Sequence, residues 1–183
     1  MPPPAPQVPK TVSIDGGFHA VECGKVTAVW SGSDADLPNE GLTPKSYGVT
    51  GLVFRFDDGA SVPFTPKGEL TFSDWSFDVF SPDCSSVALL EDHFGPYRVV
   101  STSSLQTMAG AAAVEAPKEA EASVHGQWRW VSATQFEFVA SCCGGARVFR
   151  GGVSTPIKLT SIFEAATAPK GVRPTTTGWE IVK

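Results

Sequence analysis

Short apolar runs separated by polar turn residues recur along most of the chain, and eighteen glycines and fifteen prolines supply the turns. Because successive side chains of a strand face opposite sides of a sheet, runs of this kind predict β-strands. The clearest hairpin spans residues 49–64, where Asp57-Asp58-Gly59 forms the turn. Pro63 lies in its second arm. Since proline cannot donate a hydrogen bond to a neighbouring strand, this arm is expected at the edge of a sheet.

Further segments extend the same pattern into an antiparallel meander of hairpins. Residues 11–14 and 18–22 flank the turn sequence Asp15-Gly16-Gly17 and predict a second hairpin. The pattern also predicts strands over residues 25–30, 70–80, 87–90, 97–100 and 136–139. The expected fold class is therefore all-β.

One segment departs from the strand pattern. Residues 103–122 are rich in alanine, and Ser103 is followed three residues later by Gln106, which is the arrangement of a capping box. We expect a short helix over residues 104–114, which Pro117 prevents from continuing. At most one or two short helices are predicted in the chain.

A second feature is an internal repeat. Residues 87–99 align without gaps with residues 136–148 at a constant offset of 49, which pairs Leu89 with Phe138 and Arg98 with Arg147. The blade-like segments lie near residues 75–100 and 128–150. A period of this length made of strand, turn and strand favours a propeller or a similar array.

The first of these segments resembles a blade of the TolB-type, WD40-like β-propeller repeat. It has Phe80, then Ser81-Pro82-Asp83, an apolar strand, the acidic turn 91–95 and a strand that begins at Tyr97. Cys84 stands where glycine is usual in the repeat, and Ser132-Ala133-Thr134 replaces Ser-Pro-Asp in the second segment. The resemblance covers about a quarter of the chain and implies an interaction platform.

The length of the chain limits this resemblance. Propellers commonly have four to eight blades, and 183 residues hold fewer than four periods of 49. The resemblance therefore implies a partial or minimal propeller, with a β-sandwich or barrel built from similar hairpins as the alternative. We expect one β domain over residues 11–183, preceded by a proline-rich arm over residues 1–10.

Composition narrows the classes of partner. Charged residues make up 18% of the chain and hydrophobic residues 42%, and the net charge is −5. A nucleic-acid partner is not expected, because its binding needs a positively charged surface. No apolar stretch approaches the ~18 residues of a transmembrane helix. Few charges and an incomplete propeller would both favour a homo-oligomer.

The N-terminal arm bears on localisation. Five of the first nine residues are proline, which favours a stiff extended arm. Such an arm resembles the spacer that follows the lipidated cysteine of bacterial lipoproteins. An exported, periplasmic or cell-envelope protein is therefore expected, with an ordinary frayed terminus of a cytoplasmic protein as the alternative.

The adjacent residues Asp92 and His93 are the first candidate for chemistry. They could act as a carboxylate and a general base, but neighbouring side chains on an extended chain point apart, which favours the tip of a hairpin. Trp128 and Trp130 share one strand face, either as a binding platform or, as is commoner, in the core. The candidate binding residues are Asp92, His93, Phe94, Tyr97, Trp128 and Trp130.

Cysteines and acidic residues give no metal motif. Cys142 and Cys143 rarely bond to each other as neighbours, so Cys23 is the expected partner if one disulfide forms. Cys84 and Cys142 are expected to lie too far apart to bond. The Cys142-Cys143 pair could be reactive or could simply occupy a turn. The acidic loop 33–40 offers oxygen ligands for Ca²⁺ but lacks the spacing of a calcium loop, so no metal or cofactor is expected.

These observations favour a non-enzymatic β-rich binding module that engages a protein or peptide through its loops. Known catalytic motifs are absent from the sequence. Two alternatives stay open. One is a structural subunit of a homo-oligomeric assembly. The other is a hydrolase whose site is assembled from dispersed residues, namely His19, His93, His125, Glu91 and Asp92.

Overall fold

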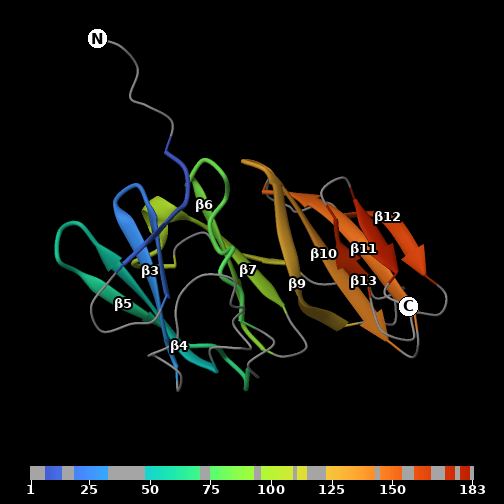
Figure 1. Cartoon of the computed structure of the whole chain (residues 1–183), viewed down its shortest axis with the longest axis horizontal. Coiled ribbons are helices and arrows are strands. Elements are labelled where there is room, and N and C mark those ends of the chain that lie inside the picture. The colour runs from blue at the N-terminus through green and yellow to red at the C-terminus, as the bar shows by residue number, and fades with distance from the viewer. Residues whose placement is uncertain are drawn as a thin grey trace, which may run out of the picture.

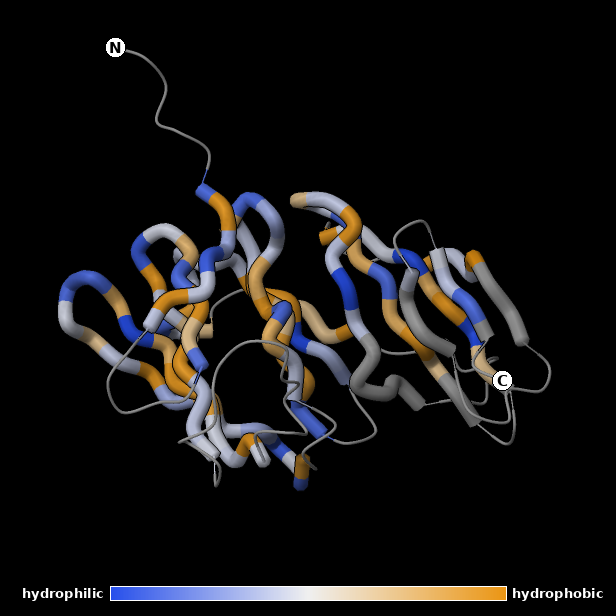
Figure 2. The backbone as a smooth tube through the Cα atoms, in the orientation of Figure 1, coloured by the Kyte–Doolittle hydropathy of each residue, from blue (hydrophilic) through white to orange (hydrophobic). Residues whose placement is uncertain are grey.

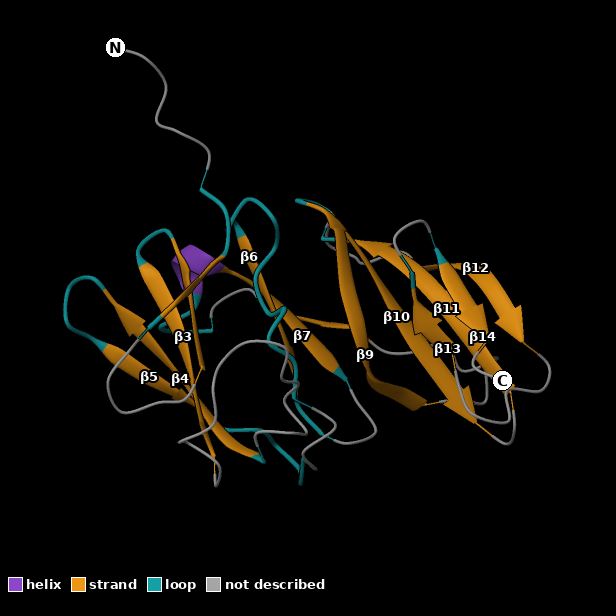
Figure 3. Cartoon of the chain, in the orientation of Figure 1, coloured by secondary structure: helices purple, strands orange, loops and turns teal. Residues whose placement is uncertain are grey.

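The structure is a computed structural model, and it describes residues 7–13, 19–32, 48–70, 75–92, 96–108, 111–114, 123–142, 145–153, 159–165, 172–175 and 178–181. Within these ranges the chain is all-β, and every strand pairing is antiparallel (Figure 3). The predicted fold class is confirmed.

The first third of the chain forms a five-stranded meander (Figure 1). Its strands follow the sequence order: β1 (Lys10–Val12), β2 (His19–Cys23), β3 (Val26–Gly32), β4 (Val49–Phe56) and β5 (Ser61–Phe64). The strands of both predicted hairpins pair as expected, and β5 with its proline is the edge strand. The turn 15–17 lies outside the described residues.

Three smaller sheets follow along the chain. The three-stranded sheet contains β6 (Ser86–Leu90), β7 (Tyr97–Ser101) and β8 (Ala112–Val114). The four-stranded sheet contains β9 (Ser123–Ser132), β10 (Gln135–Cys142), β11 (Gly145–Gly152) and β12 (Leu159–Ala165). A final hairpin pairs β13 (Val172–Pro174) with β14 (Trp179–Ile181).

The sheets stack face to face in their order along the chain. On β6, Val87 and Leu89 pack against the five-stranded sheet, whereas Ala88 and Leu90 pack against the four-stranded sheet. This explains why residues 87–90 are continuously apolar, since a strand buried on both faces has no solvent side. In Figure 2, hydrophilic residues gather at the turn between β4 and β5, away from the stacked faces.

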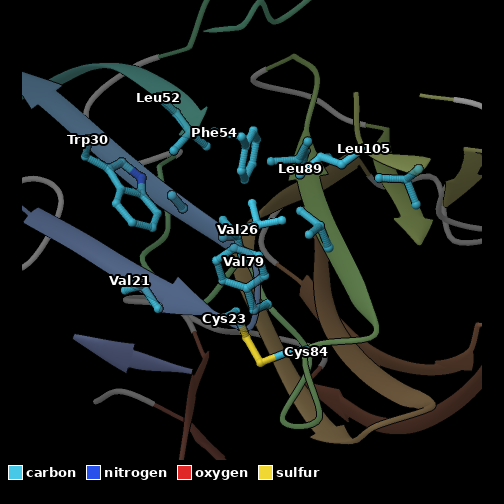
Figure 4. Close-up of a cluster of buried hydrophobic side chains, with 14 of the residues drawn as sticks. Val21, Cys23, Val26, Trp30, Leu52, Phe54, Val79, Cys84, Leu89 and Leu105 are labelled. Carbon is cyan, nitrogen blue, oxygen red and sulfur yellow. A yellow bond between two sulfur atoms is a disulfide. The ribbon is translucent and has the colours of Figure 1, made fainter. Parts of the chain in front are cut away.

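A disulfide joins the first two sheets. Cys23 at the end of β2 bonds to Cys84, with their Cα atoms 5.4 Å apart, beside the buried cluster shown in Figure 4. Cys23 was expected to be the partner of Cys142 or Cys143, but it bonds to Cys84 instead, because the facing of the first two sheets brings these two cysteines together. The side chains of Cys142 and Cys143 lie outside the described part of the structure.

The turn before β6 is held by side chains. Oδ1 of Asp83 accepts hydrogen bonds from the backbone N–H of Ser85 and from the hydroxyl groups of Ser85 and Ser81. Cys84 follows with φ 63°, in the left-handed region that favours glycine. The residue that replaces the usual glycine of the resembled repeat therefore keeps a glycine-type backbone conformation.

The predicted helix over residues 104–114 is wrong. A single 3-10 turn at Thr102–Ser104 is present instead, and Ala112–Val114 forms β8, which pairs with Tyr97–Val99. Alanine has the highest helix propensity, but propensity is a weak determinant beside tertiary contacts, and pairing with β7 buries Val114. Of the strand expected over 70–80, residues 71–74 lie outside the described residues, and within 75–80 only Phe80 forms an isolated bridge, with Val87.

The two repeated segments do form buried hairpins, as predicted, but not in equivalent register. Leu89 pairs with Arg98, whereas Phe138 pairs with Phe149 rather than with Arg147. The register is displaced by two residues because β10 continues to Cys142 and β11 begins at Gly145, so that only two residues separate the two strands. The turn predicted at residues 140–145 is therefore shorter than expected.

Candidate functional site

The predicted binding residues fall into different environments. Tyr97 and Trp128 are buried in the core between the three- and four-stranded sheets, with their ring centroids 4.4 Å apart. Trp130 is half-buried in the same cluster, and its Nε1–H donates to the carbonyl of Val79. Trp128 therefore lies in the core and not on a binding platform, since it is buried and its ring stacks on Phe136.

Asp92 lies in the connection between β6 and β7, as the hairpin interpretation predicts. Its carboxylate lies against Gly68, where a Cβ would have no room. Gly68 N–H also donates to the carbonyl of Glu91, which fixes segment 65–69 on the end of β6. His93 and Phe94 lie outside the described residues, so the Asp92–His93 pair stays a prediction.

The dispersed residues considered for a hydrolase are not brought together where the structure describes them. His19 is buried on the first sheet and stacks on Phe77, with ring centroids 3.9 Å apart. Burial lowers the pKa of His19, and the charge of Asp78 opposes this only partly. The described residues contain no group of three His, Cys, Asp or Glu that could hold a metal ion.

A groove of about 490 Å³ lies between the first two sheets, and it is the candidate binding site. Its floor is apolar and buried: Phe54 comes from β4, Leu89 from β6, and Leu105 from the segment after β7. Figure 4 shows these three side chains at one side of the buried cluster, with the disulfide at the opposite end. Val62, Phe64 and Met108 add half-buried walls. Apolar hollows of this size are typical of ligand sites.

One end of the groove is charged. Because every second side chain of a strand lies on the same face, Glu91, immediately after β6, continues the face that carries Val87 and Leu89. Glu91 is 7% exposed, and its Oε2 lies 2.8 Å from Nε of Arg98 on β7. The Nζ of Lys67, which follows β5, lies 3.3 Å from the same oxygen. The charged end therefore joins the two sheets.

The edge strand beside the groove is a poor template for strand addition. Phe56 N–H donates to the carbonyl of Ala60, so the alternating antiparallel pattern turns the backbone groups of Val62 and Phe64 toward β4. Pro63 then faces outward and offers no N–H. A ligand in the groove is therefore recognised mainly through side chains.

A second cavity, of about 510 Å³, surrounds the disulfide and shares none of the residues that line the groove. Its lining is mostly polar and includes Lys25, Asp57, Asp58, Ser85 and Gln106. Val26 and Phe56 are its large apolar side chains, fewer than in the groove, and apolar contacts give a small site most of its binding energy. The groove is the stronger candidate.

Few sequence features point to the groove residues. Lys67 and Arg98 belong to no motif, and Met108 lies in a segment that was predicted as helix. The one usable signal was Glu91, a carboxylate at the end of a continuous apolar strand.

Comparison with family models, with curated proteins and with solved structures found no match to this chain. In the described ranges there is no helix of the length and apolar character needed to cross a membrane. Function is therefore argued from the geometry of the groove.

Proposed function

We propose that this protein is a non-enzymatic binding module that engages a protein or peptide in the groove between its first two sheets. The observation that carries the proposal is the groove itself, with its buried apolar floor of Phe54, Leu89 and Leu105 and one charged end. Apolar contacts in such a groove supply affinity, and a few placed polar groups supply orientation.

The stack of sheets supports the proposed relation to propeller repeats. The sheets are meanders, and the first three bury successive faces against each other in sequence order, as blades of a propeller do. The glycine-type conformation of Cys84 in the Ser81-Pro82-Asp83 turn adds to this. We propose a partial propeller-like array, which presents binding surfaces between neighbouring sheets.

The disulfide supports an exported protein. Bonds such as Cys23–Cys84 persist in oxidising compartments and are rare in reducing ones. Together with the proline-rich arm, this favours the periplasm or cell envelope as the proposed location.

Affinity selection from a pool of synthetic N-acetylated random hexapeptides tests the binding function. We expect the wild-type protein to retain peptides rich in apolar residues, identified by mass spectrometry. Met108→Asp places a charge on the groove wall and should reduce retention at least tenfold, because burying an unpaired carboxylate is costly. Ala111→Trp, which fills the groove, should act in the same direction.

The matched control is Ile162→Asp on β12, where a large apolar residue is 38% exposed. This variant should retain peptides like the wild type. Circular dichroism and thermal unfolding check that all variants fold. The proposal is contradicted if the folded wild type retains no peptides, or if both groove variants retain the same peptides as strongly as the control.

A further inference from the structure

We infer that the groove takes the carboxyl terminus of a peptide with an apolar last residue, and that Lys67 binds the terminal carboxylate. The inference rests on the proposed peptide-binding function and adds the chemistry of the ligand. Three features of the groove support it: the hydrogen-bond donors at its charged end, the net charge of its lining, and the contacts that link the two sheets at that end.

The charged end offers hydrogen-bond donors. The carboxylate of Glu91 is buried and already faces both Arg98 and Lys67. The ammonium of Lys67 has three N–H groups, and one contact to Glu91 leaves donors for a ligand. The side chain of Lys67 is 64% exposed. The group that binds here must therefore be an acceptor.

The charge balance favours an anion. Among the residues that line the groove, Lys67 and Arg98 are cationic and Glu91 is anionic, so the lining carries a net charge of about +1. The whole chain carries −5. Within the lining this positive charge complements a carboxylate and disfavours an amine, whereas the carboxylate of Asp92, which lies against Gly68, is not part of the lining.

The closure of the groove favours a chain end over an internal acidic residue. At the charged end, the Lys67–Glu91 ion pair and the hydrogen bond from Gly68 to the carbonyl of Glu91 link the two sheets. An extended peptide that ran past Glu91 would have to break this link. A peptide that ends there places its carboxylate beside Lys67.

The neighbouring floor defines the last side chain. Leu89 precedes Glu91 by two residues on the same strand face, and Arg98 is its cross-strand partner. Phe64 lies three residues before Lys67 on the facing sheet, and both residues line the groove. A terminal carboxylate at Lys67 therefore places the side chain of the last residue of the peptide over an apolar surface.

Matched peptides test the inference. One apolar hexapeptide retained by the wild type is prepared with a free carboxyl terminus, as the terminal amide, and as a longer amide with aspartate at the former last position. Fluorescence anisotropy measures Kd on the wild type, Lys67→Gln and Lys67→Arg. Lys25→Gln is the control, because Lys25 also pairs with a carboxylate, 3.7 Å away on Asp57, but lies outside the groove.

We expect the terminal amide and the longer peptide to bind the wild type about tenfold more weakly than the free acid, as the loss of a charge-assisted hydrogen bond predicts. Lys67→Gln should bind acid and amide alike, whereas Lys67→Arg and Lys25→Gln should keep the preference. Equal binding of acid and amide by the wild type overturns the inference and leaves the binding function standing. Equal binding of the longer peptide and the free acid shows an internal carboxylate instead and also overturns it. Absence of any peptide binding overturns the proposed function itself.

Discussion

Cys84 adopts a backbone conformation that most residues avoid. Its φ of 63° puts an L-residue Cβ close to the following carbonyl, at a cost of roughly 1–2 kcal/mol. The bond to Cys23 and the hydrogen bonds around Asp83 hold the turn in place despite this cost. A single residue thus combines a strained backbone with the link between two sheets.

Substitutions at Cys84 can separate these two roles. Cys84→Gly and Cys84→Ala both remove the disulfide, but only glycine tolerates the positive φ without penalty. Urea unfolding should therefore show Cys84→Ala to be less stable than Cys84→Gly by ~1 kcal/mol. Cys23→Ala, which removes the bond but leaves an L-residue at position 84, should resemble Cys84→Ala more closely. Equal stability of the two Cys84 variants would show that the turn relaxes without the disulfide.

Leu89 and Phe138 test the core at single residues. They are 3% and 0% exposed and lie at aligned positions of the repeat. Truncation of each to alanine should lower the free energy of unfolding by ~2–5 kcal/mol, because it leaves a cavity in a packed interior. Val131→Ala is the control: Val131 is 42% exposed, and its loss should be below ~0.5 kcal/mol. Losses below about 1 kcal/mol at both core positions would refute the burial of the two strands.

At the scale of elements, the C-terminal hairpin is attached through one buried carboxylate. Glu137 on β10 is fully buried and accepts hydrogen bonds from Arg129, Arg150 and the indole N–H of Trp179. Arg129 also donates to the carbonyl of Thr175. Because Trp179 and Thr175 belong to the hairpin segment, Glu137 links β13–β14 to the four-stranded sheet.

The pKa of Glu137 follows from these contacts. Burial alone would raise it, but the hydrogen bonds from Trp179, Arg150 and Arg129, with the charge of Arg129, outweigh burial and hold the pKa below its usual value. Since the folded-state pKa is depressed, the ionised group stabilises the protein at pH values above the pKa that this carboxyl has in the unfolded chain. This stabilisation is lost as the pH falls through the folded-state value.

Glu137→Gln should therefore loosen the hairpin in a pH-dependent manner. Near neutral pH we expect a loss of ~2 kcal/mol, less than for a dry ion pair because solvent reaches both arginines. Hydrogen exchange should increase first in β13–β14. The stability difference from the wild type, measured by urea unfolding, should stay constant above about pH 5 and shrink on acidification. A stability difference that grows on acidification would contradict the lowered pKa of Glu137.

Elements with strong local signals were predictable. The Asp57-Asp58-Gly59 turn and the alternating runs around it located β4 and β5 nearly to the residue, because turn type and alternation are local properties. The segment 104–114 was not predictable in this way. Its alanines favour a helix, but its strand pairs with β7, which β6 already holds in place. These contacts lie outside the segment and override its local propensity.

The candidate site was mostly beyond prediction for the same reason. Glu91, Lys67 and Arg98 meet only because the stack brings the end of β6, β7 and the segment after β5 together. The pairing of Cys23 with Cys84 likewise depends on how two sheets face each other. Local sequence indicated the strands that carry these residues but not their contacts.

Across the whole molecule, the disulfide and the charged end of the groove lie at opposite ends of β6. Cys84 precedes this strand and Glu91 follows it. The bond therefore fixes one end of the interface between the first two sheets, and the Lys67–Glu91–Arg98 cluster links the other. The groove lies between sheets held at both ends.

Reduction of the disulfide should weaken both stability and binding. The bond spans a sequence separation of 61 residues, and closing a loop of that length in the unfolded chain corresponds to about 4 kcal/mol in the chain-entropy model. The free energy of unfolding with and without reductant measures this. Peptide affinity should fall with it, because the groove depends on the relation of the two sheets. Unchanged stability after complete reduction would contradict the structural role of the bond.

Methyl NMR can show directly whether a peptide binds between the first two sheets. The protein is labelled at the methyl groups of Ile, Leu, Val and Met and titrated with a retained peptide. We predict shift changes confined to Val62, Leu89, Leu105 and Met108, which line the groove. The methyl groups of Val139 and Val148, which lie on the far face of the four-stranded sheet against Trp179, should stay unchanged. Shift changes centred on Val139 and Val148, with none at Leu89 and Met108, would contradict peptide binding in the groove.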